Sequence, residues 1–259
     1  MNKIGRLESV WRYPVKSMRG EQVDEVFVAY TGVMGDRVYA ISSSGATPEF
    51  PWHTNREHEE FVLYNARYKN PQSTLKPVAM DAALRELLNP PYPRKSAFAL
   101  EIQAPDGDTL DIEDSAFLEG LRDKSKGELA LHFTQKNAVD CRPLSLFSHQ
   151  TLSQLEQETG MELDKRRFRA NFYVDWSSAN GFYENELVNR KLKVGDRLEI
   201  MILELDPRCK SITIDPETAE TQPRLLKHIA RKYDGFAGVY AAVLTEGSVK
   251  AGDEMYLLD

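Results

Sequence analysis

The chain has 259 residues, and its 33 lysines and arginines against 40 aspartates and glutamates give a formal net charge of −7. This acidic balance argues against a general affinity for nucleic acid or for anionic membranes. No stretch approaches the roughly 20 apolar residues that span a bilayer, and two cysteines without a signal sequence indicate a reducing compartment, so we expect a cytoplasmic globular protein.

Short β-rich segments separated by turns make up most of the chain. Alternating or β-branched patterns predict strands over residues 6–15, 22–30, 36–42, 59–68 and 98–113. The last of these should form a hairpin, because Asp106-Gly107 is a strong turn signal between two alternating runs. Helical patterns cover residues 114–123, 148–160 and 225–235, and the proline-rich stretch 70–95 is expected to wrap over the surface. Many short strands and few helices predict a mainly β fold, a barrel or sandwich rather than a doubly wound sheet.

Two segments resemble each other, "LKVGDRLEI" at 192–200 and "VKAGDEMYL" at 249–257. In each, a Gly-Asp turn leads into an alternating strand. The pair is consistent either with related edges of one barrel or with two ordinary entries from a turn into a strand. The repeat is too short to indicate duplication.

The common metal and nucleotide motifs are absent from the sequence. The five histidines form no two-histidine helical zinc motif, and no CxxC pair occurs. There is no GxxxxGK[ST] phosphate loop and no GxGxxG after a strand, and two cysteines cannot supply the four thiolates of a simple iron–sulfur cluster. We therefore expect no haem, flavin, nicotinamide or iron–sulfur site in this chain.

The segment "DPRCKSITIDPET" at 206–218 places Cys209 between Arg208 and Lys210, ahead of a predicted β-branched strand and an Asp-Pro turn. Nearby cations favour the thiolate form of a cysteine, which is the nucleophilic and metal-binding form. Most free cysteines are buried and inert, so this segment alone leaves a packing role open.

Three further motifs carry polar or cationic side chains at strand ends. Lys16 and Ser17 follow a strand as a pair of donors, although a solvated strand end explains them more simply. Arg37 follows a Gly-Asp turn, where a surface salt bridge is the simplest interpretation. In "DKRRFRANFYVDW", strand alternation would place Arg169 beside Asn171, a geometry suited to phosphate, with a solvated basic run as the alternative. Together with Cys209, these motifs describe one anionic ligand with a thiophilic end.

These motifs, in this order, resemble the MOSC proteins, named after the C-terminal domain of molybdenum cofactor sulfurase. The matching segments are "YPVKS" (13–17), "GDR" (35–37), "RFRANFYV" (167–174), "RC" followed by "TIDPET" (208–218), and "GVYAAVLTEGSVKAGDEMYLL" (238–258). The set resembles the subfamily with an N-terminal barrel domain, which includes the mitochondrial amidoxime-reducing component and its bacterial counterparts. The resemblance covers nearly the whole chain.

The resemblance implies a β-barrel-rich fold, with an N-terminal MOSC-type β-barrel domain over residues 1–105, a MOSC domain over residues 106–259, and an active site between the barrels. It implies a molybdenum cofactor, in which the dithiolene of a pterin holds the molybdenum, with Cys209 as the protein's own metal ligand. The residues implied to bind the phosphate and pterin, or to line the same pocket, are Lys16, Ser17, Arg37, Asp140, Cys141, Ser148, Arg169, Asn171 and Arg208.

The reaction that the resemblance implies is reductive removal of oxygen from a small N-hydroxylated or N-oxygenated substrate. Electrons would come from a separate ferredoxin- or flavodoxin-like donor protein, for which Lys165, Arg166 and Arg167 offer a basic patch. Two alternatives remain open: a sulfur-handling protein that carries a persulfide on Cys209, and a non-catalytic binder or carrier of the pterin.

Three positions depart from the family pattern. Pro207 stands where the animal reductases have a serine before the Arg-Cys pair, and Cys141 stands where relatives often carry a hydroxyl residue. The turn "DPETAE" replaces the more usual Asp-Pro-x-Thr-Gly. These departures bear on the reaction more than on cofactor binding.

Overall fold

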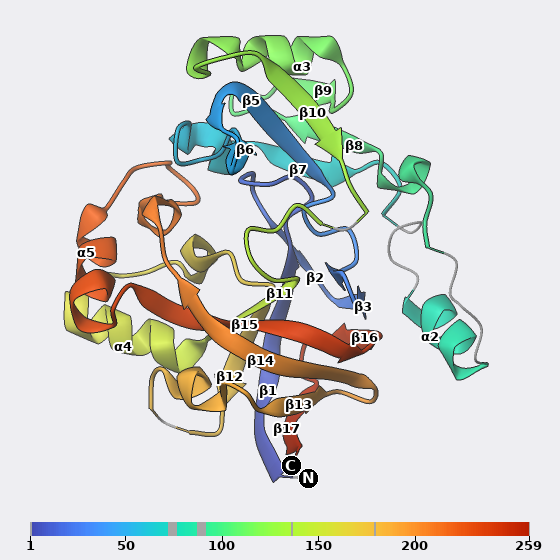
Figure 1. The fold of residues 1–259 in the computed structure, drawn as a ribbon, viewed down its shortest axis with the longest axis vertical. Helices are drawn as coiled ribbons and strands as arrows, with labels where there is room; N and C mark the ends of the chain where they lie inside the picture. The colour runs from blue at the N-terminus through green and yellow to red at the C-terminus, as the bar shows by residue number, and fades with distance from the viewer. Residues whose placement is uncertain (1, 72–76, 87–91, 136, 179, 259) are drawn as a thin grey trace.

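A closed barrel of seven strands is the largest element of the fold, which confirms the predicted mainly β class (Figure 1). The computed structural model describes residues 2–71, 77–86, 92–135, 137–178 and 180–258. The N-terminal strand pairs with residues 172–176 on one side and with residues 254–257 on the other, so the sheet closes on itself. The barrel strands are β1 (Asn2–Arg12), β11 (Leu144–Ser148), β12 (Phe172–Trp176), β13 (Lys191–Val194), β14 (Leu198–Pro207), β15 (Phe236–Thr245) and β17 (Glu254–Leu258).

Alternation of side chains explains why these segments form the barrel. In β14, Leu198, Ile200 and Ile202 are fully buried, whereas the residues between them are only partly buried. The same period of two places one face of each strand in a shared core and leaves the other toward solvent or helices. In the two similar segments of the sequence, the strands that follow the Gly-Asp turns are β14 and β17. Both belong to the barrel but are separated by β13, so the two interpretations of the repeat stay open.

Three small sheets lie beside the barrel, and several of their strands appear above it in Figure 1. The strands of the small sheets are β3 (Glu25–Ala29), β4 (Gly32–Val33), β5 (Tyr39–Thr47), β6 (Phe50–Trp52), β7 (Asn65–Tyr68), β8 (Leu100–Gln103), β9 (Thr109–Asp111), β10 (Leu129–Phe133) and β16 (Gly247–Lys250). One more short strand, β2 (Glu21–Val23), pairs with β1 at the edge of the barrel sheet.

The chain does not divide its sheets cleanly along the sequence. The N-terminal strand β1 belongs to the barrel, β10 pairs with β5, and β16 pairs with β3. The boundary between residues 105 and 106 therefore stays a prediction. Side chains from both halves of the chain can share one pocket because these pairings interleave the halves.

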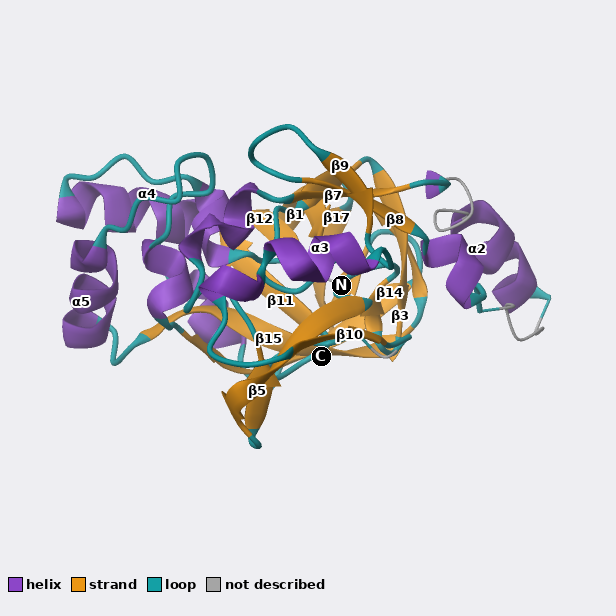
Figure 2. Ribbon diagram, turned by 90° about the horizontal axis from the view of Figure 1, so that it is seen from above, coloured by secondary structure: helices purple, strands orange, loops and turns teal. Residues whose placement is uncertain are grey.

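Four α-helices occur in the described part of the chain, and Figure 2 shows α4 and α5 at one end of the molecule and α2 at the other. None of the described helices is long and apolar enough to cross a membrane. Their bounds are α2 (Pro77–Arg85), α3 (Ser115–Gly120), α4 (His149–Thr159) and α5 (Pro223–Lys232). Short 3-10 helices are η1 (Glu59–Leu63), η2 (Lys95–Phe98), η3 (Arg122–Lys124), η4 (Lys165–Phe168), η5 (Tyr183–Leu187) and η6 (Lys210–Thr213).

The end signals of α4 are confirmed. The Ser148 hydroxyl accepts a hydrogen bond from the Thr151 amide, and Gly160 ends the helix in the left-handed conformation. The β8–β9 hairpin and its turn at Gly107 (φ +99°) are confirmed as well. Within the proline-rich stretch 70–95, Pro77–Arg85 forms α2, and residues 72–76 and 87–91 lie outside the described part.

Two segments that the sequence predicts as strands begin as 3-10 helices. Residues 59–63 form η1 before β7 starts, and residues 210–213 form η6 where a β-branched strand was expected after Cys209. Residues 165–168, the basic run expected at a strand entry, form η4. A 3-10 turn of four or five residues is too short to impose a periodic pattern, so side-chain chemistry decides it locally. In η4, for example, the Asp164 carboxylate accepts from the Arg166 amide and caps the turn.

Candidate functional site

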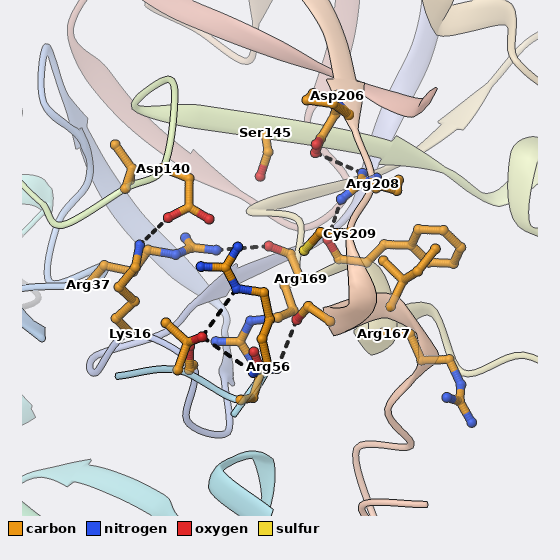
Figure 3. Close-up of a pocket in the computed structure, with 18 of the residues that line it drawn as sticks. Lys16, Arg37, Arg56, Asp140, Ser145, Arg167, Arg169, Asp206, Arg208 and Cys209 are labelled. Atoms are coloured by element: carbon orange, nitrogen blue, oxygen red, sulfur yellow. Dashed lines mark hydrogen bonds and ion pairs between the residues drawn. The ribbon is translucent and has the colours of Figure 1, made fainter. Parts of the chain in front are cut away.

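A pocket lies where the ends of β11 and β14 meet connections from the small sheets (Figure 3). It contains about 790 Å³ of space, counting the part open to solvent. Segments far apart in the sequence supply its wall, namely Lys16, Ser17, Arg37, Phe50, Thr54, Asn55, Arg56, Val139, Asp140, Arg142, Ser145, Arg167, Phe168, Arg169, Asn171, Asp206, Pro207, Arg208, Cys209, Ser211, Ile212 and Tyr240.

The structure brings together most of the residues that the sequence singled out. The ones that line this pocket are Lys16, Ser17, Arg37, Asp140, Arg169, Asn171, Arg208 and Cys209. Cys141 and Ser148 are not part of the wall. Three wall residues, Ser17, Arg37 and Arg169, hold the left-handed backbone conformation, with φ of +71°, +47° and +51°. Non-glycine residues rarely adopt this conformation, and strained residues of this kind cluster at functional sites.

Cys209 is the only cysteine of the pocket wall and is exposed. It lies between the end of β14 and the start of η6, and its backbone is extended, with φ of −119° and ψ of −174°. The two flanking cations direct their charges elsewhere. Arg208 donates to the carbonyls of Ala237 and Phe168, and the Lys210 ammonium donates to the Arg56 carbonyl at 2.7 Å.

Two guanidinium groups lie over one buried tyrosine ring and form a cationic wall. Arg37 lies 4.7 Å and Arg169 4.4 Å from the centre of the Tyr13 ring. Arg37 pairs with Asp36 and donates to the Arg169 carbonyl, whereas the Arg169 Nη2 atom is buried without a hydrogen-bond partner among the described residues. Burial, together with the neighbouring Arg37, lowers the pKa of Arg169 to about 10 against the opposing effect of Tyr13. Arg169 therefore keeps a buried donor that no described protein group accepts from.

The expectation that Arg169 and Asn171 share one strand face is wrong, because Arg169 ends η4 in the left-handed conformation and β12 begins only at Phe172. Both residues still line the pocket. The Asn171 amide serves the barrel: its oxygen accepts from the Ser145 hydroxyl, and its nitrogen donates to the Trp11 carbonyl. Asn171 therefore ties β11 and β12 to β1 at the base of the wall.

Lys16 extends the cationic wall toward the β10–β11 connection. Its side chain is almost completely buried, donates to the Ala138 carbonyl at 2.7 Å and pairs with Asp140. Burial lowers the pKa of Lys16, although Asp140 opposes this effect. An anion in the pocket would favour the charged form of Lys16.

Asp206 places a buried carboxyl group on the same wall, next to Tyr240. It is 3% exposed, and its Oδ2 lies 2.8 Å from Arg208 Nη2. Burial raises the pKa of Asp206 to about 6, despite the opposing effects of Arg208 and of a hydrogen bond with Tyr240. This carboxyl group can therefore hold a proton close to neutral pH.

The structure assigns Ser148 and Cys141 other positions. The Ser148 hydroxyl caps α4 and donates to buried Glu184 at 2.8 Å, so it belongs to the helix start rather than to the pocket wall. Cys141 is exposed between two wall residues, Asp140 and Arg142, without lining the pocket itself. Burial, and then the nearby Asp140 carboxylate, raises the pKa of Cys141.

The predicted basic patch for a donor protein is wrong in its residues. Lys165 pairs with Glu8, Arg166 pairs with Asp164 and Glu217, and Arg167 is 3% exposed. In Figure 3, Arg167 points away from the other cations, and it pairs with Asp215. A basic run in the sequence is therefore neutralised by carboxylates that folding brings to it.

Sequence reasoning missed the contribution of the β6–η1 connection. Arg56 and Asn55 reach the pocket from this segment, where the Arg56 guanidinium lies 4.0 Å from the centre of the Phe50 ring. The stretch "FPWHTNREHE" carries no helical or strand period and no known motif. A polar run between two aromatic segments was the only available signal.

Comparisons with known proteins agree with the resemblance. The model of the MOSC N-terminal beta barrel domain matches residues 4–142, and the model of the MOSC domain matches residues 130–256. The chain is 22% identical to mitochondrial amidoxime reducing component 2 of Bos taurus, over 99% of this chain and 84% of that protein. It is 23% identical to mitochondrial amidoxime-reducing component 1 of Homo sapiens, over 100% and 84%. Among solved structures, YUAD protein from Bacillus subtilis aligns with a TM-score of 0.48 and 13% identity, over 97% of this chain and 94% of that one.

Proposed function

The chain belongs to the MOSC proteins with an N-terminal MOSC β-barrel domain, and from this membership we propose that it holds a molybdenum cofactor in the pocket and reduces small N-oxygenated substrates with electrons from a separate protein. The observation that carries the proposal is the presence, in one pocket, of an exposed thiol and a buried guanidinium nitrogen, Arg169 Nη2, that has no hydrogen-bond partner among the described residues. The relatives named for amidoxime reduction are similar along the whole chain, which supports the choice of reaction.

The residues present fit such a cofactor. Among the described residues, no three His, Cys, Asp or Glu side chains gather into a metal site of their own. A metal that arrives with its own sulfur ligands suits a pocket with one thiolate donor, Cys209. Arg169, Arg37 and Lys16 would hold the cofactor's phosphate, because a buried guanidinium without a partner gains most from a charged acceptor.

The bound cofactor would supply the two-electron redox chemistry. Reduction of an N–OH group takes two electrons and two protons and releases water, so the pocket also needs a proton source. Asp206 fits this role, since its carboxyl lies in the wall and burial raises its pKa to about 6. Tyr240 lies beside it and keeps the carboxyl within the wall.

Replacing the thiol tests the proposal directly. We expect Cys209→Ala to fold normally, because the side chain is exposed, but to lose molybdenum when purified from a host that makes the cofactor. Elemental analysis and circular dichroism measure the two effects. Cys141→Ser is the matched control, and it should retain molybdenum because Cys141 is not part of the pocket wall.

The outcomes separate the proposed function from its alternatives. Wild-type molybdenum content in Cys209→Ala would remove Cys209 as the ligand. A cyanide-labile sulfur on a metal-free wild-type protein would indicate a sulfur-handling protein. Full molybdenum content without activity toward any N-oxygenated compound, given a chemical reductant, would indicate a cofactor carrier.

A further inference from the structure

The pocket contains more cationic groups than its own carboxylates neutralise. Seven lysine and arginine side chains line it, and five of them have a carboxylate partner within the protein. The pairs are Lys16–Asp140, Arg37–Asp36, Arg142–Glu204, Arg167–Asp215 and Arg208–Asp206. Arg56 and Arg169 line the pocket without forming an ion pair with a carboxylate of the described residues, although Arg56 lies close enough to Asp140 to contribute to lowering the pKa of that carboxyl.

These two arginines occupy different parts of the pocket. Arg169 comes from the η4–β12 connection of the barrel and lies over the Tyr13 ring, with its Nη2 atom buried. Arg56 comes from the β6–η1 connection and is partly exposed, over the Phe50 ring. Figure 3 shows both side chains entering the same space from separate elements. A single phosphate at Arg169 therefore leaves the charge of Arg56 to a second anionic group.

The position of Arg56 is fixed relative to Cys209. The Lys210 ammonium donates to the Arg56 carbonyl at 2.7 Å, and Asn55 Nδ2 donates to the Ser211 hydroxyl at 2.8 Å. Lys210 and Ser211 directly follow the thiol in the chain. The Phe50 ring lies against one face of the Arg56 guanidinium, and Arg56 Nε donates a hydrogen bond to the Thr54 hydroxyl at 3.3 Å. The Nη atoms are therefore held in place as donors, which reduces the entropy lost when a ligand binds.

We propose that Arg56 binds an anionic group of the substrate, so that the substrates of this protein are N-hydroxylated organic acids rather than neutral amidoximes. This inference rests on the proposed function of the same pocket. A guanidinium presents paired N–H donors that match a carboxylate in two parallel hydrogen bonds, and the Phe50 ring offers an apolar surface beside it. Arg56 acts as a specificity-determining residue, whereas Arg169 serves the cofactor.

A pair of matched substrates tests the inference. Benzamidoxime and its para-carboxylate differ only in the charged group, and reduced methyl viologen supplies electrons to both. We expect wild-type protein to favour the carboxylate in kcat/KM, and Arg56→Gln to lose this preference by about 10- to 100-fold, the effect of one charged hydrogen bond. Arg56→Lys should retain part of the preference, because it keeps the charge but not the paired donors.

Molybdenum content and a control variant outside the pocket show whether Arg56 binds an anionic group of the substrate or of the cofactor. Molybdenum content should be the same in Arg56→Gln and wild type, and Arg122→Gln, an equal change of charge on η3 outside the pocket, should keep the wild-type preference. Loss of molybdenum in Arg56→Gln, or equal changes in kcat/KM for both substrates, would overturn the inference.

Binding to molybdenum-loaded protein keeps the inference testable if neither compound is reduced. In calorimetry without reductant, tighter binding of the carboxylate than of benzamidoxime, lost in Arg56→Gln, supports the role of Arg56 even when the proposed reaction fails. The inference is contradicted if the carboxylate binds equally to wild type and Arg56→Gln, or if it does not bind to wild type.

Discussion

At the scale of single residues, the pocket is built from side chains whose backbones are held in unfavourable conformations. Ser17, Arg37 and Arg169 are all left-handed, and Arg37 donates to the Arg169 carbonyl, so two strained positions support each other. Each such residue costs on the order of 1–3 kcal/mol, which the surrounding packing must offset. These contacts hold the Arg37 and Arg169 side chains in the pocket wall.

Charge reversal at this wall separates ligand binding from general stability. We expect Arg169→Glu to lose most of its molybdenum cofactor, since one charged hydrogen bond is worth about 1.5–3 kcal/mol before repulsion is added. The control is Arg166→Glu, an equal change of charge at a residue that pairs with Asp164 and Glu217 and is not part of the pocket wall. Molybdenum and pterin analysis of both proteins measures occupancy, and equal occupancy would remove the phosphate role from Arg169.

At the scale of elements, α4 and α5 are joined through one carboxylate. Glu158 on α4 accepts hydrogen bonds from Lys232 and His228 of α5, and from Tyr233 directly after it. Burial would raise the pKa of Glu158, but these hydrogen bonds, together with one from Gln154, outweigh it and lower the pKa to about 2. The two helices cover one end of the barrel, so this contact stabilises the fold rather than the pocket.

The lowered pKa makes this contact sensitive to acid. A carboxylate with a folded pKa below its unfolded value stabilises the fold above about pH 4.5 and loses this effect as pH falls toward 2. Glu158→Gln should therefore lower the free energy of unfolding by on the order of 2–3 kcal/mol at pH 7, and the difference should shrink toward pH 2. Urea unfolding at several pH values measures it, with exposed Glu162→Gln as the control. A difference that persists undiminished at pH 2 would contradict this account.

At the scale of the whole molecule, the strand pairings interleave the two halves of the chain around one pocket. Loops of the small sheets supply Arg37 and Arg56, and connections of the barrel sheet supply Lys16, Arg169 and Cys209. The net charge of the chain is −7, yet the pocket wall carries seven cations against two carboxylates. This contrast would draw anionic ligands to the pocket rather than to the surface as a whole.

The need for a separate electron donor concerns the whole chain as well. The sequence carries no flavin or nicotinamide fingerprint, so we expect molybdenum-loaded protein with NADH or NADPH alone to reduce no hydroxylamine or amidoxime. A reduced ferredoxin, flavodoxin or viologen should start turnover, measured as product formed per molybdenum. Because Lys165, Arg166 and Arg167 are paired or buried, their replacement should leave the donor-driven rate nearly unchanged. Full activity with NADH alone would refute the need for a donor protein.

The sequence by itself determined the mainly β class, the β8–β9 hairpin, the ends of α4 and the choice of Cys209 as the cysteine to expect in the pocket. These features depend on neighbours within a few residues: side chains alternate along a strand, serine caps a helix, and glycine adopts a left-handed turn. Even the resemblance to the MOSC proteins rests on short local motifs, and the family models confirm it.

Only the tertiary structure decided which cations remain available to a ligand. The charged run from Lys165 to Arg167 looked like a surface patch, but Glu8, Asp164, Asp215 and Glu217 neutralise it from other parts of the chain. Arg56, in a stretch without any motif, lies in the pocket because Lys210 and Asn55 join its segment to the residues after Cys209. The physical reason is that charge pairing and burial depend on distances through space, and segments more than a hundred residues apart set those distances here.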